Sequence, residues 1–406
     1  MPSGLLVTGI GIVSAVGVGK SEFFDALIRG KQRFAVMARE GRQHEQSQFM
    51  GAELAALPDA ADRFDRRLFR NASLTAVFAA LGIEEAWAEA GLSRYAPTRV
   101  GLVVGGSNLQ QRELCGLQRR YAERPFFLPP AYGFSFLDTD IAGICSQQFG
   151  IRGFSYSIGG ASASGQLAVI KAAEAVQAGV VDACIAVGAL SDLSYWECQG
   201  FRSIGAMGSD RFAAQPEQAC RPFDQRHDGF IFGEACAAVV IENEASAARS
   251  DVTPYARLAG WSYNADGHRH PDPGFDGPVN AISQALAAAG LAAQDIDYVN
   301  PHGTGSSIGD ANELRVLSAI GLNHAAINTT KSITGHGLSA AGAVEFAACL
   351  LQMRHSMVHP CLNLDEPISS EFDWVLENGR ALNIGHALNL SIGFGGINTA
   401  TILSRP

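Results

Sequence analysis

Short apolar runs alternate with longer amphipathic segments along most of the chain. The clearest case lies between residues 154 and 188, where a β-prone run (Phe154–Ile158) leads into a cluster of small residues. An amphipathic segment over residues 164–178 follows, with apolar side chains at helical spacing, and then a second apolar run (Ala183–Gly188). This alternation predicts a strand, a sharp turn, a helix and a strand, in that order.

The same pattern divides the rest of the first half into further elements. Apolar runs predict strands over residues 5–13, 100–104 and 237–241. Helical spacing predicts a helix over residues 21–29, capped by Ser21, and one long helix from residue 62 to about residue 90.

Around residues 245–251 the hydrophobic pattern lapses into small and charged residues. We therefore expect two domains, residues 1–248 and 249–406, and the second repeats the first in outline. Its predicted strands cover residues 254–260, 296–300, 327–329, 388–392 and 399–403, and its predicted helices cover residues 279–289, a short stretch from residue 310, and residues 336–353. Strands and helices in alternation predict an α/β fold with mainly parallel, doubly covered sheets, whose sites form beyond the strand ends.

Composition agrees with a dense α/β enzyme. The chain has 406 residues, of which 47% are hydrophobic and 45 are glycine. It has no basic leading segment and no run of about 18 apolar residues, so we expect a cytoplasmic protein that does not cross a membrane. A formal charge of -10 argues against nucleic acid as a partner, and the 8 scattered cysteines are typical of reduced, buried thiols.

Ser162 lies on the turn between the strand at residues 154–158 and the helix that follows. Small neighbours let the chain bend there and let another group approach closely. The unpaired N–H groups and the dipole at a helix N-terminus favour negative charge, which suits a nucleophile. A serine that simply caps a buried helix would give the same pattern, so both interpretations stay open at this point.

Two further strand ends carry side chains with acid–base chemistry. The strand at residues 296–300 runs into PHGTGSSIGD, which places His302 just past its end. The strand at residues 327–329 runs into TKSITGHG, which places Lys331 and then His336 at the start of the predicted helix. The positive end of a helix favours a neutral imidazole that donates a hydrogen bond. One loop histidine is usually structural, but two at equivalent strand ends with a lysine favour a functional site.

Three other segments allow more than one interpretation. The basic stretch DRFDRRLFR is either a solvated helix face or a seat for an acidic partner; its arginines are Arg63, Arg66, Arg67 and Arg70. The stretch RPFFLPPAYGFSF is either loop and core packing or the wall of a pocket, formed by Tyr132, Phe134 and Phe136. His268 and His270 have a metal-like spacing, but no further ligand cluster accompanies them, so we expect no metal site.

Five segments of the chain, taken together, resemble the β-ketoacyl-acyl carrier protein synthases, the condensing enzymes of fatty acid and polyketide synthesis. They are VTGIGIVSAVG, RPFDQRHDGFIFGE, VNPHGTGSSIGD, TKSITGHGLSAAGAVEF and LSIGFGGINTAT, and they occur in the order found in that family over essentially the whole chain. The resemblance implies a duplicated thiolase-type fold, layered α-β-α-β-α with mixed five-stranded sheets. It also implies a homodimer.

The resemblance assigns roles to individual residues. His302 and His336 match the two catalytic histidines, and Lys331 matches the lysine beside them. Thr304 and Ser306 match residues that contact the pantetheine arm. The remaining matched positions are Phe394, a gating phenylalanine, and the four arginines named above, which fall on a carrier docking helix.

The chain departs from the family at its centre. An ungapped match from Gly165 to Gly179 places Ser162 where the family has the cysteine of T-A-C-[ST]-[ST]-G. A thiol ionises near pH ~8.5 and lower still at a helix N-terminus, whereas an alcohol is far less acidic. No base stands beside Ser162 in the sequence to activate it, so acyl transfer and condensation are not expected.

Decarboxylation needs no nucleophile. The histidines suffice, because they can polarise the thioester carbonyl of a malonyl group as an enolate forms. The chain is similar to the free-standing decarboxylating synthase-like proteins of polyketide β-branching cassettes, which carry serine at this position. We therefore expect a malonyl-acyl carrier protein decarboxylase that has no cofactor of its own and takes its substrate on the phosphopantetheine arm of an acyl carrier protein.

Two alternatives remain open. One is an acyltransferase or hydrolase that uses Ser162 with a histidine. The other is a non-catalytic partner subunit similar to the chain-length factors of type II polyketide systems. Those subunits lack the cysteine as well, but they typically lose the histidines too.

Overall fold

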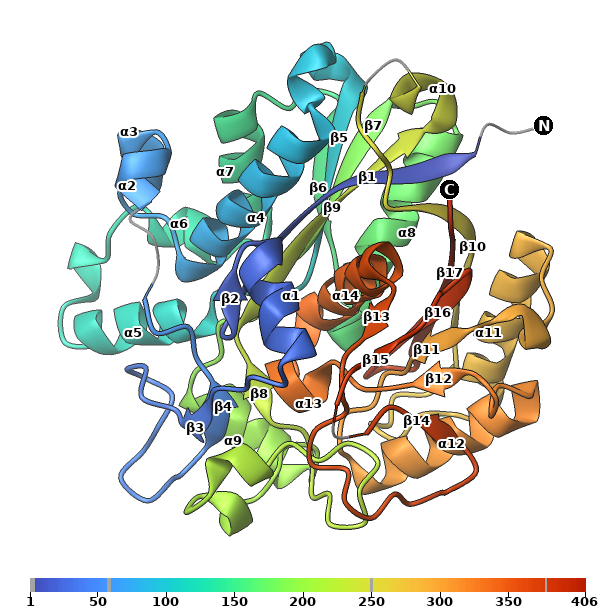
Figure 1. Ribbon diagram of the computed structural model, residues 1–406. Helices are drawn as coiled ribbons and strands as arrows, with labels where there is room; N and C mark the ends of the chain where they lie inside the picture. Colours follow the sequence, from blue (N-terminus) through green and yellow to red (C-terminus); the bar gives the residue numbers. More distant parts are fainter. Residues whose placement is uncertain (1–3, 57–59, 249–250, 377) are drawn as a thin grey trace.

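A computed structural model describes residues 4–56, 60–248, 251–376 and 378–406. Within these residues twelve strands form one mixed sheet that runs through the molecule (Figure 1). The first half of the chain supplies, from the sheet edge inward, β6 (Phe154–Ile158), β5 (Val100–Gly105), β7 (Ala183–Gly188), β9 (Ala235–Asn243) and β1 (Leu5–Ser14), with β2 (Gly17–Val18) paired to β1. The second half supplies β10 (Ala256–Ala265), β17 (Ile397–Ser404), β16 (His386–Gly393), β11 (Tyr298–Asn300), β12 (Ala326–Ile327) and β14 (Asp373–Trp374).

The two halves of the sheet repeat the same strand pattern. In the first half, β1, β9 and β7 are antiparallel neighbours, and β7, β5 and β6 are then parallel. In the second half, β10, β17 and β16 are antiparallel, and β16, β11 and β12 are parallel. Antiparallel pairing of β1 with β10 joins the halves, at Leu6 with Arg257 and Val7 with Ala256. The expected duplicated α/β fold is confirmed, with β14 as a short addition at one edge. The expectation of mainly parallel sheets is wrong, because the central strands of each half pair antiparallel and the sheet is mixed.

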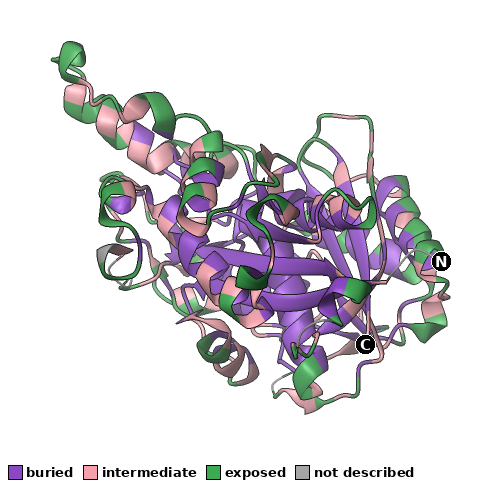
Figure 2. Cartoon of the chain, turned by 90° about the horizontal axis from the view of Figure 1, so that it is seen from above, coloured by how far each residue is buried: buried purple, intermediate pink, exposed green. Residues whose placement is uncertain are grey.

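Two helices lie between the halves of the sheet and are buried along most of their length. They are α8 (Ser164–Gln177) and α14 (Ala341–His355), which pack on each other and on strands of both halves. Residues 341–353 of α14 are all buried, which explains why that segment is apolar on every side. Figure 2 shows the buried residues concentrated in this central layer and the strands beside it.

Other helices cover the outer faces. α4 (Leu74–Ala90) packs on β1 and β9, and α11 (Asp276–Ala289) packs on β10 and β17, which completes the expected layers. Glycines in β1 allow α4 to come close, because a Cβ atom on Gly11 would lie 2.0 Å from the carbonyl oxygen of Gly82.

Shorter elements connect these layers. The helices are α1 (Lys20–Ile28), α2 (Ala60–Arg63), α3 (Arg66–Phe69), α5 (Gln111–Tyr121), α6 (Tyr132–Ser135), α7 (Thr139–Phe149), α9 (Tyr195–Ser203), α10 (Glu244–Ala247), α12 (Ser307–Ile320) and α13 (Lys331–Thr334). Two small sheets complete the described structure: β3 (Phe34–Val36), β4 (Met50–Ala52) and β8 (Phe232–Gly233) form one, and β13 (Met357–Val358) and β15 (Arg380–Ala381) form the other.

The long helix expected from residue 62 to about residue 90 is wrong, because the segment forms three helices, α2, α3 and α4. Asp65 ends the first and caps the second, accepting backbone hydrogen bonds from Arg67 (2.8 Å) and Leu68 (2.9 Å). Ser73 caps α4 through the backbone N–H of Ala76 (3.2 Å). Aspartate and serine side chains compete with the helical backbone for its N–H groups, so each starts a new helix.

Three other helix starts differ from expectation. Helix α1 begins at Lys20 after Gly19, so Ser21 does not cap it. Helix α12 begins at Ser307 and has 14 residues, so it is not short. Helix α14 begins at Ala341, because residues 336–340 form an extended bridge and a 3-10 turn. The expected domain boundary after residue 248 adjoins residues 249–250, which lie outside the described residues. None of the helices in the described ranges is long and apolar enough to span a membrane.

Candidate active site

Ser162 projects from a strained turn between β6 and α8. A single 3-10 turn, Ala161–Ala163, carries it, and Ala161 has a φ of 47°, which is unusual for a residue with a side chain. The turn is held against the end of β16, since a Cβ atom on Gly393 would lie 2.2 Å from the carbonyl oxygen of Gly160. The hydroxyl is therefore held at the N-terminal end of α8 and faces the second half of the molecule.

The side chain that Ser162 meets is His336. Its Nε2 lies 2.9 Å from Ser162 Oγ, across 174 residues of sequence. His336 lies five residues before α14, where its backbone N–H donates to the carbonyl of Ile231 (2.7 Å) and the chain forms a bridge with Phe232. The expectation that a helix N-terminus holds His336 is wrong; a strand-like contact with the first half holds it.

Burial governs the charge of both histidines. His336 is 3% exposed, and the edge of its ring contacts the ring of Phe230 at 5.2 Å between centroids. The rings of His302 and His336 are 5.5 Å apart and nearly perpendicular, at 82°. Burial, and then the nearby Lys331 ammonium, lower the pKa of both imidazoles well below the usual value. Both rings are therefore neutral at pH 7.

Lys331 links His302 to a carboxylate that the sequence analysis did not single out. Its ammonium donates to the backbone carbonyl of His302 and to Glu345 of α14, and it lies 3.5 Å from His302 Nδ1. Burial raises the pKa of Glu345 to about 7. A single carboxylate in the apolar run AGAVEFAACLL is unusual, and that signal identifies Glu345 from the sequence.

Two more carboxylates, also missed, hold the loop that carries His302. Glu313 of α12 accepts from the backbone N–H groups of His302 (2.5 Å) and Gly303 (2.7 Å). Asp310 accepts from Gly305 (3.0 Å) and lies at hydrogen-bond distance, 3.1 Å, from the His227 ring. Burial raises the pKa of Glu313 to about 8, although these backbone donors oppose the shift. Because Asp310 and Glu313 are three residues apart on α12, both face the loop.

The surroundings assign the proton on each imidazole. Lys331 approaches Nδ1 of His302 as a donor, so that nitrogen accepts and Nε2 carries the hydrogen. Nδ1 of His336 has no partner among the described residues. An unpaired acceptor is tolerated better in a protein interior than an unpaired N–H, so His336 also carries its hydrogen on Nε2. Each imidazole therefore has a neutral Nε2–H, and that of His336 lies 2.9 Å from Ser162 Oγ.

A cavity of about 360 Å³ connects these groups to the surface. Ser162, His302 and His336 line it, and Thr304 and Ser306, which share a hydrogen bond of 3.2 Å, line it on the side of the second half. Phe394, in the turn between β16 and β17, is 38% exposed at the opening. The sequence predicts seven residues that bind or act on the substrate. Six of them line this one cavity, and the seventh, Lys331, is buried and does not line it.

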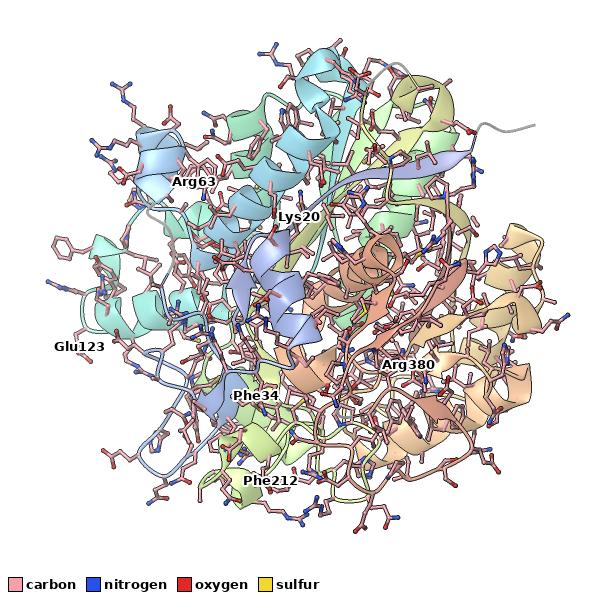
Figure 3. The ribbon with its side chains drawn as sticks, in the orientation of Figure 1. Lys20, Phe34, Arg63, Glu123, Phe212 and Arg380 are labelled. Carbon is pink, nitrogen blue, oxygen red and sulfur yellow. The ribbon has the colours of Figure 1, made fainter. Side chains whose placement is uncertain are left out.

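The four arginines do not belong to the cavity wall. All are exposed, with Arg63 at the end of α2, Arg66 and Arg67 on α3, and Arg70 just after α3 (Figure 3 labels Arg63). The expectation that they share the face of one helix is wrong, because Asp65 breaks that helix. Arg63 forms an ion pair with Glu84 at 2.8 Å.

Two other segments, the aromatic stretch around Tyr132 and the loop with His268 and His270, allowed more than one interpretation from the sequence. The aromatic stretch does not wall the cavity, since neither Tyr132 nor Phe134 nor Phe136 lines it and Phe134 is 66% exposed. His270 lies at the cavity opening, and its ring is 5.9 Å from that of His268. Among the described residues no three His, Cys, Asp or Glu side chains cluster in a way that could hold a metal ion.

Comparison with known families agrees with this architecture. The model of the β-ketoacyl synthase N-terminal domain matches residues 4–247, and the model of the C-terminal domain matches residues 255–365. The chain belongs to the β-ketoacyl synthase family. Among solved structures, a β-ketoacyl synthase from Burkholderia phymatum STM815 is similar, with a TM-score of 0.91 and 27% identity over 100% of both chains.

Curated members of the β-ketoacyl synthase family are similar over nearly their whole length. The polyketide biosynthesis malonyl-ACP decarboxylase PksF of Bacillus subtilis is 53% identical over 401 residues, which is 99% of this chain and 96% of that protein. The 3-oxoacyl-[acyl-carrier-protein] synthase 2 of Coxiella burnetii is 30% identical over 99% of this chain and 98% of its own. Similarity is therefore much higher to a decarboxylase than to that condensing enzyme.

Proposed function

We propose that this protein removes CO₂ from a malonyl group on an acyl carrier protein and leaves an acetyl group, in a polyketide pathway. One observation carries the proposal: two neutral imidazoles line a cavity together with a serine hydroxyl, at the position that the sequence resemblance assigns to the family's cysteine. The 53% identity to a malonyl-ACP decarboxylase over nearly the full length supports it.

The geometry accounts for each electron pair in the reaction. The bond between Cα and the carboxylate of the malonyl group breaks, CO₂ leaves, and its electron pair forms the Cα=C bond of an enolate. Negative charge then gathers on the thioester oxygen, where Nε2–H of His302 and Nε2–H of His336 donate to it. Donors already in place stabilise that charge more in the transition state than in the bound substrate. A proton on Cα completes the acetyl group.

Lys331 supports the histidines without touching the reacting atoms. Its ammonium fixes the His302 loop and holds Nδ1 as an acceptor, and its charge adds to burial in lowering the pKa of both rings. Glu345 compensates that charge in the interior. We infer that Thr304 and Ser306 receive the pantetheine arm and that Phe394 controls access at the opening. The proposed reaction uses no metal or organic cofactor, so every group that acts belongs to the chain or to the substrate.

The hydrogen bond between Ser162 and His336 favours a second function, acyl transfer or hydrolysis through Ser162. A base lies at 2.9 Å, which the sequence analysis could not detect. A carboxylate usually orients such a base through its other ring nitrogen. Among the described residues, however, Nδ1 of His336 has no carboxylate partner. The tautomer assigned above also makes Nε2 a donor, so it cannot accept the serine proton. Decarboxylation therefore remains the better fit.

We also infer that the acyl carrier protein docks on the exposed arginines, and that the protein is a homodimer. The edge strand β6 pairs only with β5 in the described part of the chain and exposes Tyr156. Phe134 and Phe136 of the preceding segment are exposed as well. A second copy would cover these groups.

A silent partner subunit is the weaker alternative, because the histidines are present and in place. The cytoplasmic location stays a prediction.

Mass spectrometry of malonyl-carrier protein after incubation with the protein tests the proposal. Loss of CO₂ from the carrier-bound group, with no change in the mass of the protein, is the expected result. Transfer of malonyl to the protein would instead support the acyltransferase, and an unchanged carrier would support the silent subunit.

A further inference from the structure

Ser162 has a hydroxyl hydrogen that the protein itself does not use. Among the described residues, Nε2 of His336 is the one hydrogen-bond partner of Ser162 Oγ. Because His336 carries its hydrogen on Nε2, the serine oxygen accepts that bond. The hydroxyl hydrogen is then left without an acceptor, and the cavity that Ser162 lines is the space into which it can point.

The cavity places a base in that space during the proposed reaction. When the enolate oxygen lies between Nε2 of His302 and Nε2 of His336, Cα lies two bonds from that oxygen. Ser162 Oγ lies 2.9 Å from Nε2 of His336, so the serine hydroxyl is on the same side of the cavity as the group that holds the enolate oxygen. Two of the other cavity hydroxyls donate within the protein, since Ser191 donates to Ser339 (3.1 Å) and Thr304 donates to Ser306 (3.2 Å).

We propose that Ser162 is the proton donor that converts the enolate into the acetyl group. This inference rests on the proposed function and assigns the step after loss of CO₂. The O–H bond of Ser162 breaks as a C–H bond forms at Cα, and the electron pair of the Cα=C bond moves into the new C–H bond. The serine oxygen is left as an alkoxide, and water that enters after the product leaves returns its proton.

The structure favours a short-lived alkoxide at this position. Ser162 lies two residues before the first residue of α8, a helix of 14 residues, whose N-terminus favours negative charge. That helix N-terminus lowers the cost of removing the hydroxyl proton without requiring a base, so Ser162 acts as an acid and not as a nucleophile.

The hydrogen isotope content of the product tests this proposal. Malonyl-carrier protein is decarboxylated in equal parts of H₂O and D₂O, and the deuterium content of the new acetyl methyl group is measured. Deuterium that enters the malonyl methylene group by exchange before the reaction is measured in unreacted substrate and subtracted. Thiol S–H groups hold less deuterium than O–H groups at equilibrium with mixed water. Ser162→Cys is therefore expected to lower the deuterium fraction of the acetyl group, and Ser162→Ala is expected to shift it to the value that water alone gives.

The matched control is Ser339→Cys, which places a thiol elsewhere on the cavity wall and should keep the wild-type deuterium fraction. If the wild type and both Ser162 variants give the same fraction while all release CO₂, water delivers the proton and the proposal is overturned. Complete loss of CO₂ release in Ser162→Ala would also overturn it, since a donor that acts after C–C cleavage is not needed for the cleavage. Failure of the proposed function is a different result, namely no CO₂ release by the wild type.

Discussion

Lys331 forms an ion pair with Glu345 in the interior, where the two side chains are only 2% and 3% exposed. The same ammonium donates to the backbone carbonyl of His302. A buried pair of this kind stabilises little by itself, because desolvation of both charges offsets their attraction. Its effect here is on the histidines, because burial lowers the pKa of both imidazoles and the Lys331 ammonium lowers it further.

A pH–rate profile tests that dependence. Burial and Lys331 lower the pKa of His302 and His336, so both stay neutral well below pH 6.5, and decarboxylation should persist as pH falls from 7 to 6. In Lys331→Met the charge is gone and only burial lowers these pKa values, so the acidic loss of kcat should move toward higher pH. An acid limb near pH 6.5 in the wild type would contradict this account.

The same shifts predict a change in stability. Because the folded state keeps both histidines neutral, it binds fewer protons than the unfolded state below pH 6.5. The free energy of unfolding should therefore fall as pH drops below 6.5. Circular dichroism at each pH distinguishes this loss from a catalytic effect.

Removal of either imidazole should slow the reaction strongly. We expect His302→Ala and His336→Ala each to lower kcat on the order of 10²- to 10³-fold, as loss of one preorganised oxyanion donor does. Single-turnover CO₂ release measures the effect, and an unchanged circular dichroism spectrum serves as the folding control. Near-wild-type rates in both variants would remove the proposed mechanism.

Ser162→Ala should retain decarboxylation. The variant loses one hydrogen bond to His336, worth roughly 0.5–1.5 kcal/mol, which corresponds to about tenfold in CO₂ release at most. Intact-protein mass spectrometry of the wild type during turnover should show no acyl adduct. An adduct mapped to Ser162 that forms and decays at the catalytic rate would show that Ser162 is a covalent nucleophile after all.

Ser162→Cys should create a reactive thiol. The strained turn and the N-terminus of α8 remain in the variant and lower the pKa of a thiol placed there. The native cysteines offer a built-in comparison, because seven of the eight are buried and burial raises the pKa of Cys145 to about 12. Faster labelling by iodoacetamide at position 162 than at any native cysteine is the expected result. Equal labelling would argue that Ser162 does not occupy the family's cysteine position.

Reversal of two exposed arginines should weaken carrier binding. Arg66→Glu with Arg70→Glu is expected to raise the apparent KM for malonyl-carrier protein, and the wild-type KM should depend strongly on salt. The rate on a small malonyl-pantetheine thioester should hardly change, because neither arginine lines the cavity. Lys31→Glu with Arg33→Glu makes the same charge change on another exposed segment and is the control. Equal losses on both substrates would mean that the arginines are structural.

The sequence by itself determined the elements of the fold and the chemistry of the site. The bounds expected for β6 and β7 agree with the structure, because an alternating run (β6) and a fully apolar run (β7), each bounded by turn residues, leave few alternatives. The motifs that follow strands predicted Ser162, His302, Lys331 and His336 as site residues, because loops at strand ends are where α/β folds place their sites.

Only the tertiary structure decided how these groups act on one another. The contact between Ser162 and His336 spans 174 residues, and the partner of Lys331 lies on a different helix, α14. Local propensity gave the wrong result at residues 62–90, where the caps Asp65 and Ser73 overrode helical spacing. Hydrogen-bond distances, burial and the pKa shifts that follow from them are properties of chain segments brought together in space, and no local pattern of residues encodes them.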